Sequence, residues 1–488
     1  MEYKFPLHAG EIGEYEWGSL LVRFASLAKV SPRIVIEIIA GAIAGNATWT
    51  NGAEFRGYIA ILHEVVHYFQ DAYTSIGHWD YFVKRKYVPD VLAYARLIGW
   101  LTESFPPYPI DNGDIVDPSS DLFDDIATYK SSLQEMLFQL IYPASVGFSN
   151  HRSELVLKYM RSIQSPVPVQ SGDEQPFTIR NLLEAEAAAT VWLQIYDLKM
   201  ADEQWEIAQD NASLFGPGKM PEIYAGTIRN VLQVMDYKFG AKTGKDESVW
   251  TGFKLRLSML LTVLLVDLAC AYPTPVQLES SDLQKDYEPG IRFIRLLSAF
   301  QSLAEKETIN DFVLAIHNSE FEQAEGFLLQ ECEFPYLKAA DIYKSWITYY
   351  GKLEDVDDQV LKFRKNCIAQ RVNDFSSYIF KRPSLAINKT HLYWITPKGM
   401  EALGSSPEYL DSKSKNIYVA DFLRQKKEWE LVNFFFMSGE YHCPLAETNF
   451  CEAVTPTCRS GIRRLEQLPP KPGCLIRSGL EESQFNLF

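Results

Sequence analysis

The chain has 488 residues, of which 47% are hydrophobic and 23% charged, and its formal net charge is −16. This length predicts two or three domains, and the composition is that of an ordinary globular protein. The acidic balance argues against nucleic acid as the main partner, because phosphate binding needs a basic surface. The N-terminal residues show no basic segment followed by an apolar stretch, so we expect no signal peptide and a cytoplasmic location.

Two helices are expected near the start of the chain. The first begins at about residue 31, because Ser31 can serve as an N-cap and Pro32 follows at the first helical position. The second runs from about Asn51 to Ser75 and contains the segment ILHEVVHYFQD, residues 61 to 71. Its apolar residues recur on one side, as in a helix that packs against a core.

Further elements follow along the chain. Residues 178 to 200, TIRNLLEAEAAATVWLQIYDLKM, predict another helix. Residues 257 to 272 form the most apolar run, but it contains Asp267 and is shorter than the about 20 residues that a membrane span needs. We therefore interpret this run as a buried core helix and expect no membrane contact. A short strand-like stretch, HLYWIT, occupies residues 391 to 396.

These patterns predict a mainly α protein with little β structure. The Pro-containing segment 272 to 284 is the best candidate for a domain boundary. We expect a multi-helix domain at 1–275, a helical accessory domain at 276–439 and a Cys-rich tail at 440–488. The C-terminal half is the part expected to recognise a substrate or a partner protein.

His63, His67 and Gln70 share one edge of the second helix. On a wheel of about 100° per residue they fall within a narrow arc, and the apolar positions lie opposite them. Two histidines four residues apart on one helix face can bind a single Zn²⁺. Glu64 could then act as general base on a zinc-activated water. Asp71, four residues after His67, is expected to accept the second imidazole N–H and fix its tautomer.

The HEVVH motif at 63 to 67 resembles the zincin superfamily of metallopeptidases, and the longer form HEVVHYFQ is similar to one seen in several bacterial zincin-like families. Tyr73 stands where the metzincin pattern has its third histidine, so that class is excluded. His78 is interpreted as a loop histidine. The resemblance therefore points to the gluzincin class, in which a Glu from a downstream helix is the third ligand.

Two glutamates on the helix NLLEAEAAAT could fill that role. Glu184 shares its face with small apolar residues, where a carboxylate is costly unless a partner such as zinc is present. Glu186 points to another side and is expected to be solvated. The resemblance thus implies a zinc site formed by His63, His67 and Glu184, with Glu186 as the alternative third ligand.

Four of the seven cysteines lie close together in the tail, which suggests a second, structural Zn²⁺ site. These are Cys443, Cys451, Cys458 and Cys474. No C-x-x-C pair is present among them, so free or paired thiols stay open as alternatives. The other three are interpreted as ordinary buried thiols: Cys270, Cys332 and Cys367.

The sequence as a whole predicts a zinc-dependent metallopeptidase that hydrolyses a peptide bond of an intracellular protein. Glu64 is the expected base in this reaction. The alternative is a non-catalytic helical binding or scaffold protein with an inert or structural zinc site. A zinc hydrolase that acts on a bond other than a peptide also stays open.

Overall fold

The computed structural model describes residues 13–16, 21–24, 48–84, 177–197, 222–239, 247–272, 289–332, 337–353, 359–381, 393–396 and 399–402, with a few isolated residues between them. The chain divides into two compact units, Met1–Tyr81 with Met160–Ala420 and Phe82–Tyr159 with Asp421–Phe488. Nearly all described residues belong to the first unit. The three-domain division stays a prediction, and both the Cys-rich tail and most of the helix expected near residue 31 lie outside the described residues.

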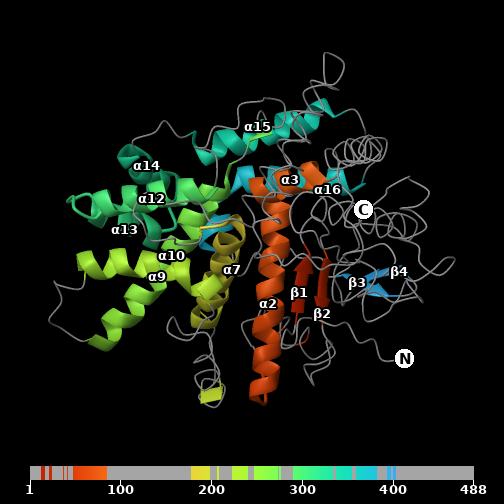
Figure 1. The fold of residues 1–488 in the computed structure, drawn as a ribbon, viewed down its shortest axis with the longest axis horizontal. Helices are drawn as coiled ribbons and strands as arrows, with labels where there is room; N and C mark the ends of the chain where they lie inside the picture. Colours follow the sequence, from red (N-terminus) through yellow and green to blue (C-terminus); the bar gives the residue numbers. More distant parts are fainter. Residues whose placement is uncertain are drawn as a thin grey trace, which may run out of the picture. The chain divides into compact units, whose positions relative to one another are not determined.

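Helices dominate the described chain (Figure 1). Two antiparallel hairpins accompany them, β1 (Gly13–Glu16) with β2 (Leu21–Phe24) and β3 (Tyr393–Thr396) with β4 (Gly399–Ala402). The expectation of a mainly α protein with little β structure is confirmed for these residues. The helices are α2 (Gly52–Tyr73), α3 (Ser75–Phe82), α7 (Ile179–Asp197), α9 (Glu222–Phe239), α10 (Glu247–Cys270), α12 (Pro289–Leu303), α13 (Ile309–His317), α14 (Phe321–Glu331), α15 (Ala339–Lys352), α16 (Gln359–Asn373) and α17 (Phe375–Phe380).

Helix α2 begins close to its predicted start because its first turn is capped. The Asn51 side chain accepts hydrogen bonds from the backbone N–H groups of Ala53 and Glu54, both at 3.0 Å. The Glu54 carboxylate reaches back and accepts from the N–H of Thr50 at 2.7 Å. A helix leaves its first N–H groups without partners, and the Asn51 side chain satisfies two of them while Glu54 binds the chain just before the helix.

Helices α7 and α10 pack together in the core of the first unit. Residues 257 to 272 are buried without interruption, so the interpretation of this run as a core helix is confirmed. Helix α7 packs against α2 and α9 as well as α10, and its four alanines between 185 and 189 are all buried. Such small side chains allow helices to approach closely, which brings α7 beside the helix of the HEVVH motif. No helix in the described part of the chain is long and apolar enough to cross a membrane.

A sharp corner separates α2 from α3. Thr74 has an extended backbone, and α3 begins at the next residue, Ser75. Gly77 then lies directly against the end of α2. A Cβ at this position would be 2.1 Å from the carbonyl oxygen of Asp71, so only glycine fits.

Two arginines of α16 hold this corner. Arg364 donates to the Asp71 carboxylate at 2.8 Å and to the Asp71 carbonyl at 2.9 Å. Arg371 donates to the carbonyl of Tyr73 at 3.1 Å and pairs with Asp267 of α10. All four charged side chains have an exposed fraction of 0%. A buried charge requires a partner, so these contacts fix α16 against the end of α2.

His78 lies on α3 and is completely buried, so its interpretation as a loop histidine is wrong. Its Nε2 is 2.9 Å from the carbonyl oxygen of Ala72, which requires a proton on Nε2, and its Nδ1 accepts from the hydroxyl of Tyr350 on α15. Burial and the charges of Arg364 and Arg371 hold the pKa of His78 well below its usual range. His78 is therefore a neutral packing residue.

Candidate metal centre

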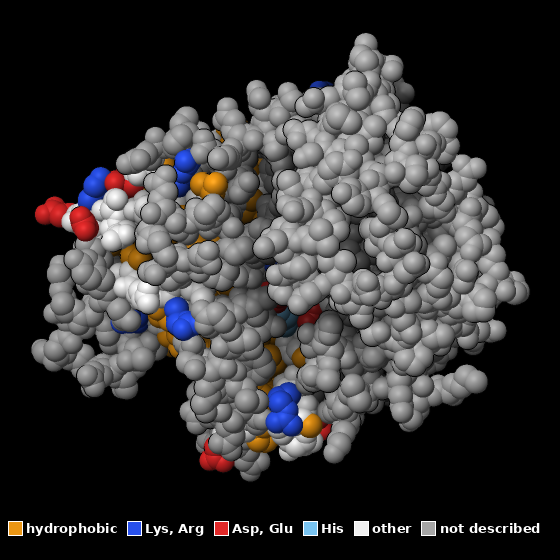
Figure 2. Space-filling view, viewed as in Figure 1, with side chains coloured by type: hydrophobic (Ala, Val, Ile, Leu, Met, Phe, Trp, Pro, Cys, Tyr) orange, Lys and Arg blue, Asp and Glu red, His pale blue; other side chains and the backbone are white. Residues whose placement is uncertain are grey.

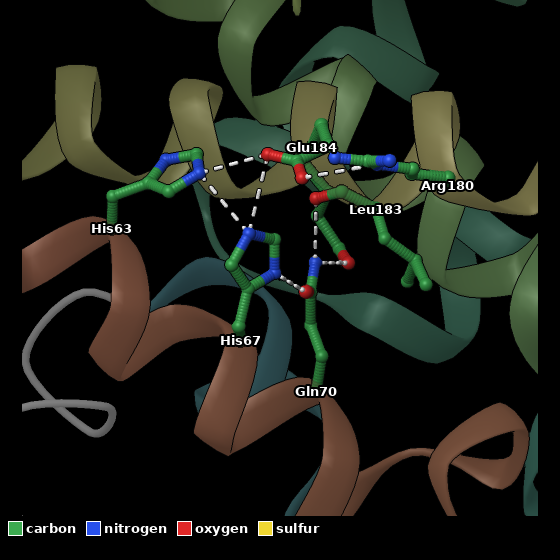
Figure 3. A network of polar contacts seen from close by, with 7 residues as sticks. His63, His67, Gln70, Arg180, Leu183 and Glu184 are labelled. Atoms are coloured by element: carbon green, nitrogen blue, oxygen red, sulfur yellow. Dashed lines mark hydrogen bonds and ion pairs between the residues drawn. The ribbon is translucent and has the colours of Figure 1, made fainter. Parts of the chain in front are cut away.

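Helices α2 and α7 bring the three predicted zinc ligands together (Figure 3). His63 and His67 point from α2 toward Glu184 on α7. The Oε2 atom of Glu184 is 2.9 Å from Nε2 of His63 and 3.3 Å from Nε2 of His67. The two Nε2 atoms are 3.1 Å apart. The three residues offer one ligand atom each, all within 4.8 Å of one another.

These distances fit a single metal ion. With ligand bonds of about 2.0–2.1 Å, neighbouring corners of a tetrahedral zinc site lie roughly 3.3 Å apart. If both imidazoles carried a proton on Nε2, the two N–H groups would face each other across 3.1 Å. A divalent cation would instead be bound by all three lone pairs. Three protein ligands are also the number that a catalytic zinc takes, with the fourth position left to water or substrate.

The cluster is buried on the side of His67 and more open on the side of its two partners. The His67 side chain is 6% exposed, whereas those of His63 and Glu184 are each 16% exposed. The partial exposure of His63 and Glu184 gives solvent access to the cluster along the edge that they form. Figure 2 shows that histidine and acidic side chains are visible on the face of the molecule drawn there.

The cluster strongly shifts the protonation of its members. Although burial alone would lower it, the charge of Glu184 raises the pKa of His67 to about 9, assisted by the charge of Glu64 and the hydrogen bond to Gln70. Burial favours the neutral form of Glu184, but the charge of His67 and hydrogen bonds from both histidines hold the pKa of this carboxyl well below its usual range. Without a cation the cluster holds a proton on His67, which a bound metal would have to displace.

Gln70 contacts His67 on the side away from Glu184. Its Oε1 is 2.7 Å from Nδ1 of His67, and its Nε2 donates to the Leu183 carbonyl at 2.9 Å and to the Glu186 carboxylate at 2.6 Å. Glu186 is completely buried, so the expectation that it is solvated is wrong. The reason is that α7 is covered by α2, α9, α10 and α12, which leaves this carboxylate no path to solvent.

Asp71 does not have the role expected from its spacing. Its carboxylate accepts hydrogen bonds from Arg364 and from the hydroxyl of Tyr15 on β1, and Gln70 instead contacts the Nδ1 of His67. The expectation that Asp71 fixes the His67 tautomer is therefore wrong. Tyr15 also stacks on the His67 ring, with centroids 6.4 Å apart. Nothing distinguishes this tyrosine from the other 25 in the sequence, so its place beside the cluster could not be predicted.

Two charged residues flank the cluster. Glu64 follows His63 on α2 and is partly exposed, and its charge contributes to the raised pKa of His67. Arg180 lies one turn before Glu184 on α7, with its Nε 3.9 Å from Oε1 of that residue. The positive charge of Arg180 thus attracts the outer carboxylate oxygen, while Oε2 faces the imidazoles.

The cysteines divide between the described and the undescribed parts of the chain. Cys270 and Cys367 are buried thiols outside any disulfide, as expected, and Cys332 is also outside any disulfide but only half-buried. The four tail cysteines lie outside the described residues. A second zinc site at Cys443, Cys451, Cys458 and Cys474 stays a prediction.

Comparisons with protein-family models, with curated proteins and with solved structures found no match to this chain. The resemblance to zincins consequently depends on the HEVVH motif at 63 to 67 and on the geometry around it. The cluster itself is therefore the feature of this chain that bears on its function.

Proposed function

We propose that this chain is a zinc-dependent metallopeptidase of gluzincin-like type, with a protein or peptide as its substrate. His63, His67 and Glu184 hold the zinc ion, and Glu64 is the general base. The observation that carries this proposal is the convergence of two Nε2 atoms and one carboxylate oxygen from α2 and α7, at separations of 2.9 to 3.3 Å. That separation matches the ligand spacing of a tetrahedral zinc site.

Each residue has a distinct task in the reaction. When bound, zinc would polarise the scissile carbonyl and lower the pKa of a water molecule. Glu64 takes a proton from the attacking water and delivers it to the leaving amine. His67 is held by Gln70 and Glu184 on its two sides, so its ring has little freedom to turn. The partial exposure of His63 and Glu184 gives the substrate access to the same edge.

The test combines metal content and cleavage in the purified full chain. Wild-type protein is expected to contain zinc, which His63→Ala should reduce. Glu64→Gln should retain the zinc bound to the three ligands and lose about 10²–10⁴-fold in the rate of cleavage, since a positioned general base contributes that much. Elemental analysis measures the zinc, and mass spectrometry of a digested proteome-derived peptide library measures cleavage.

Two exposed residues of the first unit provide matched controls. His317→Ala on α13 and Glu322→Gln on α14 remove the same side chains far along the chain from the cluster and should change neither zinc content nor cleavage. Cleavage retained by Glu64→Gln would overturn the mechanism. A zinc-loaded wild type that cleaves no peptide would favour the non-catalytic binding protein. Zinc that persists in His63→Ala would point to the tail cysteines.

A further inference from the structure

Gln70 has no freedom in how it presents its amide. It is completely buried, and its NH₂ group donates to two acceptors from α7, the Leu183 carbonyl and the Glu186 carboxylate. An amide NH₂ has two protons, so both are used by these contacts. If the amide were turned by 180°, its oxygen would face two other oxygens at 2.9 and 2.6 Å. The carbonyl oxygen of Gln70 must therefore face His67.

The orientation of the Gln70 amide in turn determines which ring nitrogen of His67 carries a proton. An amide oxygen can only accept, so the Nδ1 of His67, 2.7 Å away, must carry a proton. In a neutral imidazole with Nδ1 protonated, the lone pair is on Nε2. That is the nitrogen that faces His63 and Glu184. The hydrogen bonds are thus donated in one direction, from Nδ1–H of His67 to Gln70 and from the Gln70 amide to Glu186.

Burial of the Glu186 carboxylate is unfavourable for folding, and the hydrogen bond from the Gln70 amide offsets part of this penalty. Glu186 is two residues from Glu184 on α7, and its carboxylate contacts the Gln70 amide, while that of Glu184 meets the imidazoles. A buried carboxylate destabilises the fold unless hydrogen bonds replace those it made with water. Helix α7 therefore supplies one ligand of the cluster, Glu184. It also supplies Glu186, whose contact with Gln70 orients a second ligand, His67.

We propose that Glu186 and Gln70 act as a relay that fixes the Nδ1–H tautomer of His67 and thereby sets the affinity of the cluster for zinc. The inference rests on the proposed zinc site and assigns both as positioning residues. Carboxylates that contact a ligating histidine directly are a known way to orient it, and their loss typically lowers metal affinity 10- to 100-fold. Here an amide is inserted between carboxylate and imidazole.

The relay is tested with Glu186→Gln and with an exchanged pair, Gln70→Glu combined with Glu186→Gln. The single variant allows the Gln70 amide to turn, so zinc affinity should fall 10- to 100-fold. The exchanged pair again places an oxygen that only accepts beside Nδ1 and an amide donor behind it, but the other oxygen at position 70 faces the Leu183 carbonyl, which loses its donor. It should therefore recover the protected Nδ1–H and part of the affinity. Competition between the full chain and a chromogenic chelator for zinc ions measures the affinity.

A second readout follows the proton itself. In the full chain labelled with ¹⁵N-histidine, the Nδ1–H signal of His67 is assigned by its loss in His67→Ala. This signal should be protected from exchange with water in the wild type and the exchanged pair, and unprotected in Glu186→Gln. A purely structural role of Glu186 would not make the exchanged pair restore both the affinity and the signal. Where Glu186→Gln does not fold, the exchanged pair alone is compared with the wild type.

Matched controls are buried residues of the same type. Glu325→Gln removes a buried carboxylate on α14, and Gln194→Ala removes a buried amide on α7; both should leave zinc affinity unchanged. Unchanged affinity and an unchanged Nδ1–H signal in Glu186→Gln would overturn the relay while leaving the zinc site intact. If the wild type binds no zinc at the cluster, the proposed function fails, and the difference in Nδ1–H protection between the metal-free wild type and metal-free Glu186→Gln still decides whether Glu186 holds Gln70 against His67.

Discussion

His67 and His78 lie on consecutive helices and are both buried, yet their surroundings give them opposite protonation behaviour. Beside His67, burial is outweighed by the carboxylate of Glu184, which raises the pKa to about 9. Around His78, burial acts together with Arg364 and Arg371, and the pKa falls well below its usual range. The neighbouring charges therefore decide which of the two histidines is suited to a cation site.

Gly77 allows a test of how a single residue shapes the corner between α2 and α3. Gly77→Ala should lower the free energy of unfolding by about 2 kcal/mol or more, because its Cβ would overlap the Asp71 carbonyl at 2.1 Å and force the corner apart. Gly326→Ala and Gly351→Ala, where a Cβ meets nothing within 4 Å, should instead stabilise their helices by roughly 0.5–1 kcal/mol. Urea unfolding of the three variants measures the difference. Equal effects at all three positions would contradict this account of the corner.

The residues at the cluster were predictable only in part. A helical wheel suffices to place His63, His67 and Gln70 on one edge, because that arrangement is local to α2. It could not assign Asp71 or Glu186 correctly, because their partners come from other elements. Asp71 meets Arg364 of α16 and Tyr15 of β1, and no periodicity within α2 contains that information.

The first and last residues of a helix could be predicted from the local sequence, whereas the packing of one helix against another could not. The observed limits of α2 lie within two residues of the predicted ones at Asn51 and Ser75, because capping and apolar spacing are local properties. The contact between α2 and α7 joins residues 121 apart in the chain, as His63 and Glu184 are. Only the resemblance to gluzincins predicted this contact.

The contribution of the contact between α16 and α2 to stability can be tested at the Arg364–Asp71 pair. Arg364→Met should lower the free energy of unfolding by about 3–5 kcal/mol, because it leaves the Asp71 carboxylate buried next to an apolar side chain. Lys306→Met is the control, since the Lys306–Glu331 pair has a lysine that is 54% exposed, and its loss should cost less than about 1 kcal/mol. Chemical denaturation measures both. A loss for Arg364→Met as small as that of the control would show that the pair does not hold the corner.

Glu325 affects the pH dependence of the whole molecule. Burial raises its pKa to about 7, despite the hydrogen bond from the N–H of Ala339 and the charge of Lys338, which lower it. A carboxyl with a higher pKa in the folded chain stabilises the fold fully below its ordinary pKa of 4.5. That contribution is lost as the pH rises to about 7, and it amounts to as much as about 3 kcal/mol.

The corresponding prediction concerns Glu325→Gln. This variant should show a smaller fall in unfolding free energy between pH 4.5 and 7.5 than the wild type, because the group that loses its proton is gone. Urea unfolding across this range measures the slope. Glu322→Gln, an exposed neighbour on α14, should retain the slope of the wild type. A slope in Glu325→Gln that equals the wild-type slope would mean that the pKa of Glu325 is not raised.

For the molecule as a whole, the mainly α class was predictable because long apolar runs at helical spacing recur along the described chain, even where a helix such as α13, α14 or α15 has no side-chain cap. The β1–β2 hairpin was not anticipated, since four-residue strands such as GEYE carry little periodic signal. The buried pairing of Arg371 with Asp267 was not predicted. A lone Asp within an apolar run indicates that a partner exists, but the sequence does not identify which residue it is.

The two arginines of α16 also determine when the corner can be completed during synthesis. Asp71 and Arg364 are 293 residues apart. A ribosome that adds about 5–20 residues per second supplies Arg364 roughly 15–60 s after Asp71. During that interval the nascent chain already contains His63, His67 and, later, Glu184, but lacks the guanidinium groups that fix the end of α2. The support of the cluster is thus completed only after Arg364 has been made, 293 residues after Asp71, which delays the final geometry of the cluster until then.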